Sequence, residues 1–146
     1  MDFTKDGFII STEKEKLDVD LIHSFLNRTY WAEGISKEII RRSIEGSLCF
    51  GVFENHKQVG FARTITDKAT FAYLADVFII EEYRGRGLSK WLMEVIMSHP
   101  DLQGLRRMIL ATKDAHELYK KFGFTQLNNV DRWMHIHFPN VYKAIK

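Results

Sequence analysis

A short loop rich in glycine and arginine carries the clearest chemical signal in the sequence. In DVFIIEEYRGRGLSKWLM, Gly85 and Gly87 separate an apolar run from a segment with helical periodicity. A helix start presents free backbone N–H groups and a positive dipole end, and glycine lets backbone approach an anion closely. Arg84 and Arg86 add positive charge, so the loop suits a phosphate group. The alternative is a tight strand-to-helix turn with solvated arginines.

Two well-known nucleotide-binding loops do not fit this segment. A nucleoside triphosphate loop needs Gly-Lys followed by Ser or Thr, and that string is absent from the chain. The dinucleotide fingerprint needs a third glycine three residues after the second, where the chain has Lys90. Neither nucleotide-binding fold is therefore favoured.

The loop resembles motif A of the GNAT superfamily of N-acetyltransferases. That motif is Gln or Arg, two residues, Gly, one residue, then Gly or Ala. Arg84 and Gly87 match it, and Ser89 takes the last small position. The downstream segment ATKDAHELYKKFGF is similar to motif B: Tyr119 falls on the family's tyrosine, and Thr112 stands where many relatives have Asn. Both motifs occur in the family's order, and the resemblance covers nearly the whole chain.

The resemblance implies that acetyl-coenzyme A (acetyl-CoA) is the acyl donor. The strand before the loop looks like the family's fourth strand, whose splayed edge pairs with the pantetheine arm as an added strand would. Backbone contacts are therefore expected from Phe78 and Ile79. The full set of cofactor-binding residues implied by the two motifs and this strand is Phe78, Ile79, Arg84, Gly85, Arg86, Gly87, Leu88, Ser89 and Thr112.

Direct acyl transfer to an amine needs an uncharged nucleophile, a stabilised oxyanion and a proton for the departing thiolate. Tyr119, with an ordinary pKa near ~10, stays protonated at neutral pH and is the candidate proton donor. The alternative is a tyrosine of the core. An alkylamine with a pKa near ~10.4 needs about 4–5 kcal/mol to become neutral at pH 7, so a base is useful.

Asp76 is the carboxylate that the strand offers for this purpose. Relatives that acetylate polyamines carry Glu where this chain has Ala75, so that role cannot be transferred. We expect Asp76 to act through a water or to hold the amine as an ion pair. The alternative is a structural carboxylate that caps a nearby turn.

The loop after the first predicted helix contains Tyr30, Trp31 and Glu33. In the GNAT superfamily this loop commonly walls the acceptor pocket, and aromatic rings with one carboxylate suit a cationic amine. Alternatively, Trp31 packs on the edge of the core and Glu33 is solvated. His135 and His137 share a strand face without a third ligand at matching spacing, so no metal is expected.

Hydrophobic periodicity predicts the elements that position these residues. Strands are expected over 7–11, 48–53, 58–65, 70–80 and 107–111, near Phe124, and over 132–138. Helices are expected after a cap at Asp18 or Asp20, after Ser36, from the glycine loop to Pro100, and from Asp114 to Gly123. The fold class is α/β (α+β). The resemblance implies a GNAT fold with a mostly antiparallel mixed sheet of six to seven strands, a V-shaped splay and about four helices on both faces.

Composition limits the partners and the setting. The chain has 146 residues, 45% of them hydrophobic, and a formal net charge of +2, which fits one domain over 1–146 and favours neither nucleic acid nor a membrane as partner. No apolar stretch approaches the ~20 residues that span a bilayer, and no signal peptide pattern opens the chain. The one cysteine, Cys49, lies in an apolar run, and a reducing cytoplasm is expected.

The function expected is transfer of an acetyl group to a primary amine of a small molecule, by a monomer or homodimer. A protein lysine or N-terminus is the alternative acceptor. In another class, a coenzyme A-binding sensor or scaffold without turnover is suggested by Ser89, Thr112 and Ala75.

Overall fold

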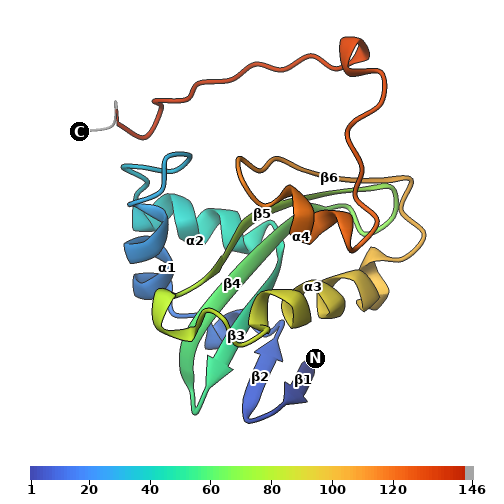
Figure 1. Ribbon diagram of the computed structural model, residues 1–146. Helices are drawn as coiled ribbons and strands as arrows, with labels where there is room; N and C mark the ends of the chain where they lie inside the picture. Colours follow the sequence, from blue (N-terminus) through green and yellow to red (C-terminus); the bar gives the residue numbers. More distant parts are fainter. Residues whose placement is uncertain (144–146) are drawn as a thin grey trace.

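Six strands form one sheet, in chain order, in the computed structural model, which describes residues 1–143 (Figure 1). The strands are β1 (Asp2–Lys5), β2 (Phe8–Ser11), β3 (Leu48–Glu54), β4 (Lys57–Thr66), β5 (Phe71–Ile79) and β6 (Arg107–Leu110). Neighbouring strands from β1 to β5 are antiparallel, and β5 and β6 are parallel. The predicted mostly antiparallel mixed sheet is therefore confirmed.

Helices cover both faces of this sheet (Figure 1). The α-helices of the described residues are α1 (Val19–Leu26), α2 (Lys37–Glu45), α3 (Leu88–Ser98) and α4 (His116–Lys120). Short 3-10 helices are η1 (Lys14–Lys16), η2 (Glu81–Tyr83), η3 (Pro100–Leu102) and η4 (Val130–Arg132). Side chains of consecutive strand residues point to opposite faces. Cys49 Sγ lies 4.0 Å from the carbonyl oxygen of Ile44 in α2, whereas Phe50 packs edge to face against His99, just after α3.

The first two α-helices begin where their capping residues predict. Asp18 accepts a hydrogen bond from the Leu21 N–H at 3.0 Å, so it, and not Asp20, caps α1. Ser36 accepts one from the Ile39 N–H at 3.2 Å and caps α2. These short polar side chains satisfy backbone donors that the first turn of a helix leaves free.

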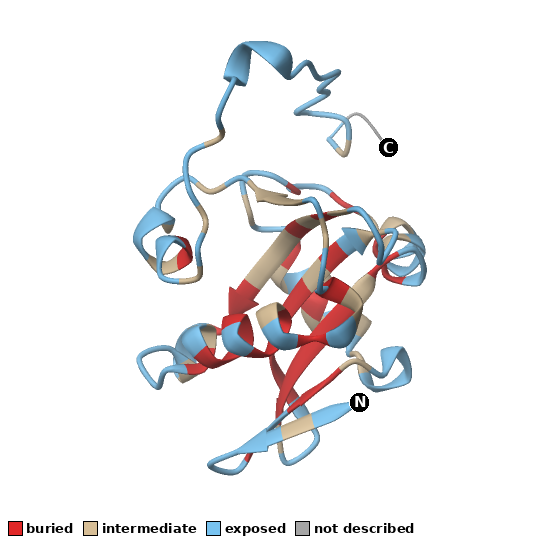
Figure 2. Ribbon diagram, turned by 90° about the vertical axis from the view of Figure 1, so that its right-hand side faces the viewer, coloured by how far each residue is buried: buried red, intermediate tan, exposed pale blue. Residues whose placement is uncertain are grey.

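The core lies between the sheet and the inner faces of the helices, where Figure 2 shows the buried residues. Helix α3 contributes Leu92, Met93 and Ile96, which are fully buried, and the sheet contributes Phe50 and Phe61. No α-helix within residues 1–143 is long and apolar enough to cross a membrane.

Strands β5 and β6 part halfway along β5. Strand β6 pairs only with Phe71–Leu74, so the second half of β5 has a neighbouring strand on the β4 side alone. This parting is the V-shaped splay expected of the fold. A β-bulge lies at the point of divergence, where Asp76 has a φ of 56° and β5 carries one residue more than β4.

Three sequence-based expectations about elements need correction. The hairpin partner β1 was not predicted; its turn uses Asp6 and Gly7, both with positive φ. The strands expected near Phe124 and over 132–138 were wrong, because residues 124–127 and 133–138 pair with no described strand and Arg132 belongs to η4. A period-two pattern supplies the side chains of a strand but not the neighbouring strand that completes its hydrogen bonds.

Candidate active site

The glycine loop joins η2 to α3 in a left-handed backbone conformation. Gly85 has a φ of 79° and Gly87 a φ of 77°, which side chains with a Cβ rarely adopt. Gly87 is the N-cap of α3, and no side chain accepts a hydrogen bond from the first turn. A Cβ added at Gly85 or at Gly87 would meet no atom within 4 Å. The loop therefore presents backbone N–H groups to open space at the positive end of a buried helix.

A pocket of about 230 Å³ lies directly in front of this loop. It brings together residues from the end of β5, the loop, the start of α3 and α4. They are Ile79, Tyr83, Arg84, Gly85, Gly87, Leu88, Ser89, Lys90 and Leu118. Most of the cofactor-binding residues expected from motif A and its strand thus line one pocket, and Leu118 connects it to motif B.

The two arginines of the loop have different environments. Arg84 donates from Nε to the carbonyl oxygen of Ile79 at 2.9 Å and lines the pocket, so its guanidinium lies at the parted strands. The guanidinium of Arg86 lies 4.8 Å from the ring centre of Tyr83, and Arg86 is not among the residues that line this pocket. Arg84 is therefore the loop arginine placed to meet an anion in the pocket.

The open edge of β5 is presented by Ile79. The Ile80 N–H donates to the carbonyl oxygen of Val59 in β4, and backbone groups of neighbouring strand residues point to opposite edges. Ile79 therefore directs its own backbone groups away from β4, toward the splay. Phe78, in register with Phe61, directs its backbone toward β4 instead, and its ring stacks on Phe25 at 4.0 Å between centroids.

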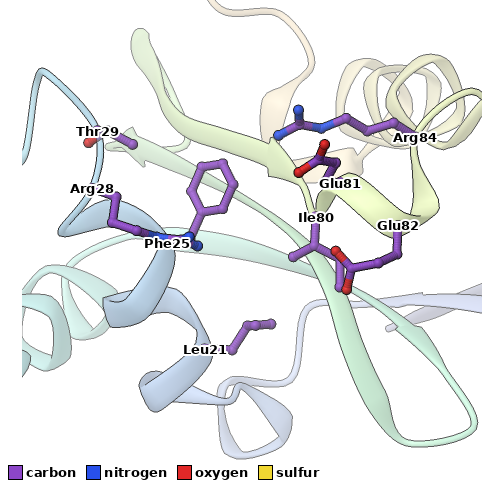
Figure 3. A pocket seen from close by; sticks show the side chains of 8 residues that line it. All are labelled: Leu21, Phe25, Arg28, Thr29, Ile80, Glu81, Glu82 and Arg84. Carbon is purple, nitrogen blue, oxygen red and sulfur yellow. The ribbon is translucent and has the colours of Figure 1, made fainter.

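A second pocket, of about 330 Å³, lies on the other side of Arg84, between α1 and η2 (Figure 3). Its lining combines apolar side chains with charges of both signs: Leu21, Phe25, Arg28, Thr29, Ile80, Glu81, Glu82 and Arg84. Because Arg84 lines both pockets, they adjoin at the open end of β5.

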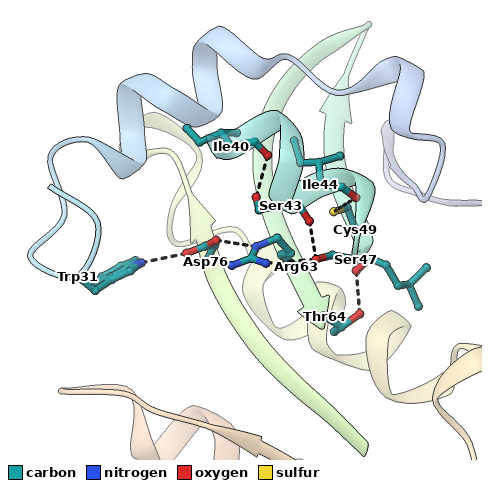
Figure 4. Close-up of polar contacts among 10 residues, drawn as sticks. Trp31, Ile40, Ser43, Ile44, Ser47, Cys49, Arg63, Thr64 and Asp76 are labelled. Carbon is teal, nitrogen blue, oxygen red and sulfur yellow. Dashed lines mark hydrogen bonds and ion pairs between the residues drawn. The ribbon is translucent and has the colours of Figure 1, made fainter. Parts of the chain in front are cut away.

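Asp76 lies within a hydrogen-bonded network (Figure 4). One carboxylate oxygen accepts from Trp31 Nε1 at 3.0 Å and the other from Arg63 Nε at 2.9 Å. Only 11% of the Asp76 side chain and 16% of the Arg63 side chain are exposed. Arg63 also donates from Nη1 to Ser47 Oγ at 3.2 Å. The network ties the loop after α1 to the bulge in β5.

Tyr119 lies on the inner side of α4. It is 9% exposed and packs edge to face against Phe124 at 5.9 Å. Burial, with a smaller contribution from the charge of Asp114, raises the pKa of the Tyr119 hydroxyl above its usual value. The hydroxyl therefore keeps its proton throughout the neutral range, as a proton donor must.

The family model of the GNAT acetyltransferase domain matches residues 45–126, which is more than half of the chain. The protein belongs to the GNAT acetyltransferase family. A Gibberella zeae protein assigned as an acetyltransferase is 31% identical, over 82% of this chain and 79% of that protein. A crystal structure from Xanthomonas campestris pv. campestris, assigned to the GNAT family, is 48% identical, with a TM-score of 0.93 over 97% of this chain and 100% of that one.

The fold is also similar to a structure from Clostridium acetobutylicum, described as an acetyltransferase with acetyl-CoA. Identity to that chain is 15%, the TM-score is 0.66, and the match covers 89% of this chain and 96% of that chain. The homologues and the family model show that this protein is an acyltransferase enzyme.

The matched part of this GNAT acetyltransferase contains the glycine loop and α4, but not the loop after α1. In that loop, Tyr30 and Trp31 are 64% and 44% exposed and pack edge to face at 5.1 Å. The Lys113 ammonium lies 5.4 Å from the ring centre of Tyr30. Glu33 lies apart from this cluster and pairs with Lys143 at 3.4 Å.

Thr112 and Cys49 of the acetyltransferase both lie in structural surroundings. Thr112 Oγ1 accepts a hydrogen bond from the Ala115 N–H at 3.1 Å, at the turn before α4. Cys49 is buried, and burial raises the pKa of its thiol to about 11, so it is not a nucleophile at neutral pH. No cluster of metal-ligating side chains occurs within the described part of the chain.

Sequence reasoning missed several residues of the acetyltransferase site. Arg63 could have been noticed, because it is the only charged residue of the apolar strand 58–65. Arg28, Glu81 and Glu82 gave no comparable signal, because charged residues near helix and strand ends are usually solvated. Only the packing of α1 beside η2 brings these three into one pocket.

Proposed function

We propose that this GNAT acetyltransferase transfers the acetyl group of acetyl-CoA to a primary amine of a small molecule. The observation that carries the proposal is the pocket in front of α3, lined by the glycine loop, by Ile79 and by Leu118. Leu118 is the immediate neighbour of Tyr119. The glycine loop offers an anion site, β5 offers an open edge, and α4 carries the protonated hydroxyl of Tyr119, which is not itself among the residues that line the pocket.

The residues of this pocket fit coenzyme A. The uncapped first turn of α3 and the guanidinium of Arg84 offer donors to a pyrophosphate. Positive φ at Gly85 and Gly87 leaves the side toward the ligand free of Cβ atoms. The outward backbone of Ile79 suits the amides of a pantetheine arm. The fold shared with the Clostridium acetobutylicum structure, described with acetyl-CoA, supports this assignment.

The reaction proposed is direct transfer. The amine nitrogen forms a bond to the thioester carbonyl carbon, the bond from that carbon to sulfur breaks, and the electron pair leaves with the sulfur. Tyr119 donates its hydroxyl proton to the thiolate, and its raised pKa keeps the hydroxyl protonated at neutral pH until that step. The amine loses one proton to a base or to solvent. The products are an amide and a free thiol.

The acceptor side is proposed to be the pocket between α1 and η2 together with the aromatic loop. Its lining carries the carboxylates of Glu81 and Glu82 beside two arginines, and Phe25 and Ile80 give it an apolar wall. We expect the two carboxylates and the Phe25 ring to hold an alkylammonium ion. Both oxygens of Asp76 already accept hydrogen bonds, so we propose that it serves the acceptor by holding Trp31 in place. We propose that Tyr30, Trp31 and the more distant Glu33 contact the acceptor amine when it is bound or as it enters the pocket.

We also propose that residues 1–146 form one acetyltransferase domain and that the protein acts in the cytoplasm. The fold supports one domain, because α1 to α4 pack on a single sheet and share one core. A buried unpaired cysteine, Cys49, is compatible with a reducing compartment.

Two matched glycine substitutions test the cofactor site. Gly87→Ala and Gly104→Ala each introduce a methyl group at a positive φ, 77° and 72°, with no atom within 4 Å. Both variants should therefore lose a similar stability, about 1–2 kcal/mol. Only Gly87→Ala should weaken acetyl-CoA binding, by about tenfold or more, which is ~1.4 kcal/mol. Calorimetric titration and a thermal melt of each variant measure both effects, and equal affinities for the two variants would remove the site from this loop.

A further inference from the structure

The pocket between α1 and η2 is lined by charges of both signs that do not pair with one another. Arg28 and Arg84 bring positive charge to its lining. Glu81 and Glu82 bring negative charge. No ion pair within residues 1–143 involves any of these side chains. Charged groups that line one cavity without neutralising each other are available to a ligand that carries both signs of charge.

The unpaired charges come from opposite sides of this pocket (Figure 3). Arg28 follows the last turn of α1, whereas Glu81 and Glu82 lie in η2, at the open end of β5. Phe25 and Ile80 add apolar surface to the same lining. The pocket therefore has a cationic side, an anionic side and an apolar wall.

The guanidinium of Arg28 is oriented by a hydrogen bond within its own segment. Its Nε donates to the carbonyl oxygen of Ser24, one turn earlier in α1, at 2.9 Å. The donors of both Nη atoms remain for a ligand. Parallel N–H groups of a guanidinium match the oxygens of a carboxylate, because both groups are planar. Arg28 is therefore prepared to bind an acid group.

The other arginine of the pocket, Arg84, is expected to be neutralised by the cofactor. It lines both pockets, and its guanidinium is placed to meet the pyrophosphate of acetyl-CoA. With that anion bound, Arg28 is the cation that the lining still offers to an acceptor. A ligand that satisfies the remaining charges has an anionic group for Arg28 and a cationic group for Glu81 and Glu82.

The charge of Arg28 disfavours two other kinds of small acceptor. A diamine with one ammonium at Glu81 and Glu82 would bring its second ammonium toward a guanidinium, and like charges at short range repel. A phosphate monoester carries about −1.5 to −2 charge at neutral pH, more than one arginine balances beside two carboxylates. A carboxylate carries a single negative charge, which one guanidinium balances.

We propose that the acceptor is a small amino carboxylate, with its amine toward Glu81 and Glu82 and its carboxylate on Arg28. This inference rests on the proposed acetyl transfer and specifies the class of acceptor. Arg28 is then a specificity-determining residue that selects acceptors by their acid group. The transfer step is unchanged: the amine becomes an amide, coenzyme A leaves as the thiol, and the carboxylate stays as it was. Phe25 and Ile80 contact the carbon chain between the charged ends.

Matched pairs of acceptors test the role of the acid group. Amino carboxylates of graded chain length are each compared with their own primary amides, which keep the amine and the shape but lose the negative charge. For the best chain length, the wild-type kcat/KM should be about tenfold higher for the acid than for the amide. In Arg28→Gln this preference should disappear, with an unchanged circular dichroism spectrum because Arg28 is exposed. No wild-type preference for the acid, or a preference that survives Arg28→Gln, would overturn the proposal.

Two further variants control for the charge and its position. Arg42→Gln removes a 73% exposed arginine of α2 that pairs with Glu38, and it should keep the wild-type preference. Arg28→Glu reverses the charge in the pocket, so a diamine should become a better acceptor than the amino carboxylate of the same length. If the wild type already prefers the diamine, or an aminoalkyl phosphate of that length, the assigned class is wrong.

Calorimetric titration separates this inference from the proposed function. The amino carboxylate and its amide are each titrated into protein saturated with coenzyme A, so that binding is measured without turnover. The wild type should bind the acid about tenfold more tightly than the amide, and Arg28→Gln should bind both alike. Selective binding of the acid without thiol release from acetyl-CoA would contradict the proposed transfer and support the acid site. Thiol release with equal or undetectable binding of acid and amide would overturn the acid site alone.

Discussion

At the residue scale, Tyr119 combines burial with a retained proton. Its raised pKa means that the hydroxyl stays protonated up to a pH above the usual value, and the ability to donate is lost as pH rises through that pKa. The same shift makes folding less favourable as pH rises through the pKa, so activity and stability should be followed together.

Tyr119→Phe should lower kcat by roughly 10²-fold to 10⁴-fold, with acetyl-CoA affinity nearly unchanged, because a proton donor acts mainly in the transition state. The alkaline decline of kcat should disappear along with the hydroxyl. Steady-state kinetics across pH measure both effects. Tyr73→Phe, on the paired half of β5, is the control and should keep wild-type kcat. An unchanged kcat in Tyr119→Phe would mean that water protonates the thiolate.

Asp76→Asn should disturb the acceptor side without affecting acetyl-CoA. Asparagine keeps the shape and tolerates the positive φ of 56°, but it leaves Arg63 without its anion and removes one acceptor. We expect a loss of about 1–3 kcal/mol in the free energy of unfolding and a higher KM for amines. Asp20→Asn removes an exposed ion pair with Lys37 and is the control, which should leave the free energy of unfolding nearly unchanged.

The pH–rate profile separates two roles for Asp76. If it positions Trp31, an alkylamine and a weakly basic aromatic amine should lose similar activity. If it takes or relays the amine proton, only the alkylamine should be affected, and its pH optimum should move upward, toward where the amine is already neutral. Unchanged KM for both amines, with lost stability, would leave Asp76 a purely structural residue.

At the element scale, local signals predicted the parts of the fold that depend on neighbours in sequence. The caps at Asp18 and Ser36 follow from side chains that reach the next turn, and both are confirmed. The hairpin between β3 and β4 is also confirmed. It could be predicted locally, because a polar turn joins two apolar runs that are adjacent in sequence. The glycine loop too is local, since strand, loop and helix follow directly in the chain.

The elements that sequence could not predict depend on partners distant in the chain. The 132–138 segment has the alternation of a strand, but its hydrogen-bonding partner is not encoded in that segment. The bulge at Asp76 appears only when β5 is set against β4. Similarly, the ion pair between Asp76 and Arg63 joins two strands, and the pocket of Arg28 and Glu81 requires α1 to lie beside η2.

At the scale of the whole molecule, the proposed cofactor site lies within the part of the chain matched by the family model. The acetyltransferase model covers residues 45–126, which include the glycine loop and α4. The loop after α1 and the C-terminal arm, residues 128–143, lie outside that part. These two segments contact each other through Glu33 and Lys143.

We propose that this protein moves an acetyl group from acetyl-CoA to an amine. The most direct measurement is thiol release from acetyl-CoA against a panel of small amines, polyamines and lysine-containing peptides, with the acetylated product identified by mass spectrometry. We predict thiol release that depends on a small primary amine, one amide formed per thiol, and strong reduction by Tyr119→Phe. Tight binding of acetyl-CoA with no thiol release above background for any amine would contradict the claim and identify a coenzyme A-binding sensor.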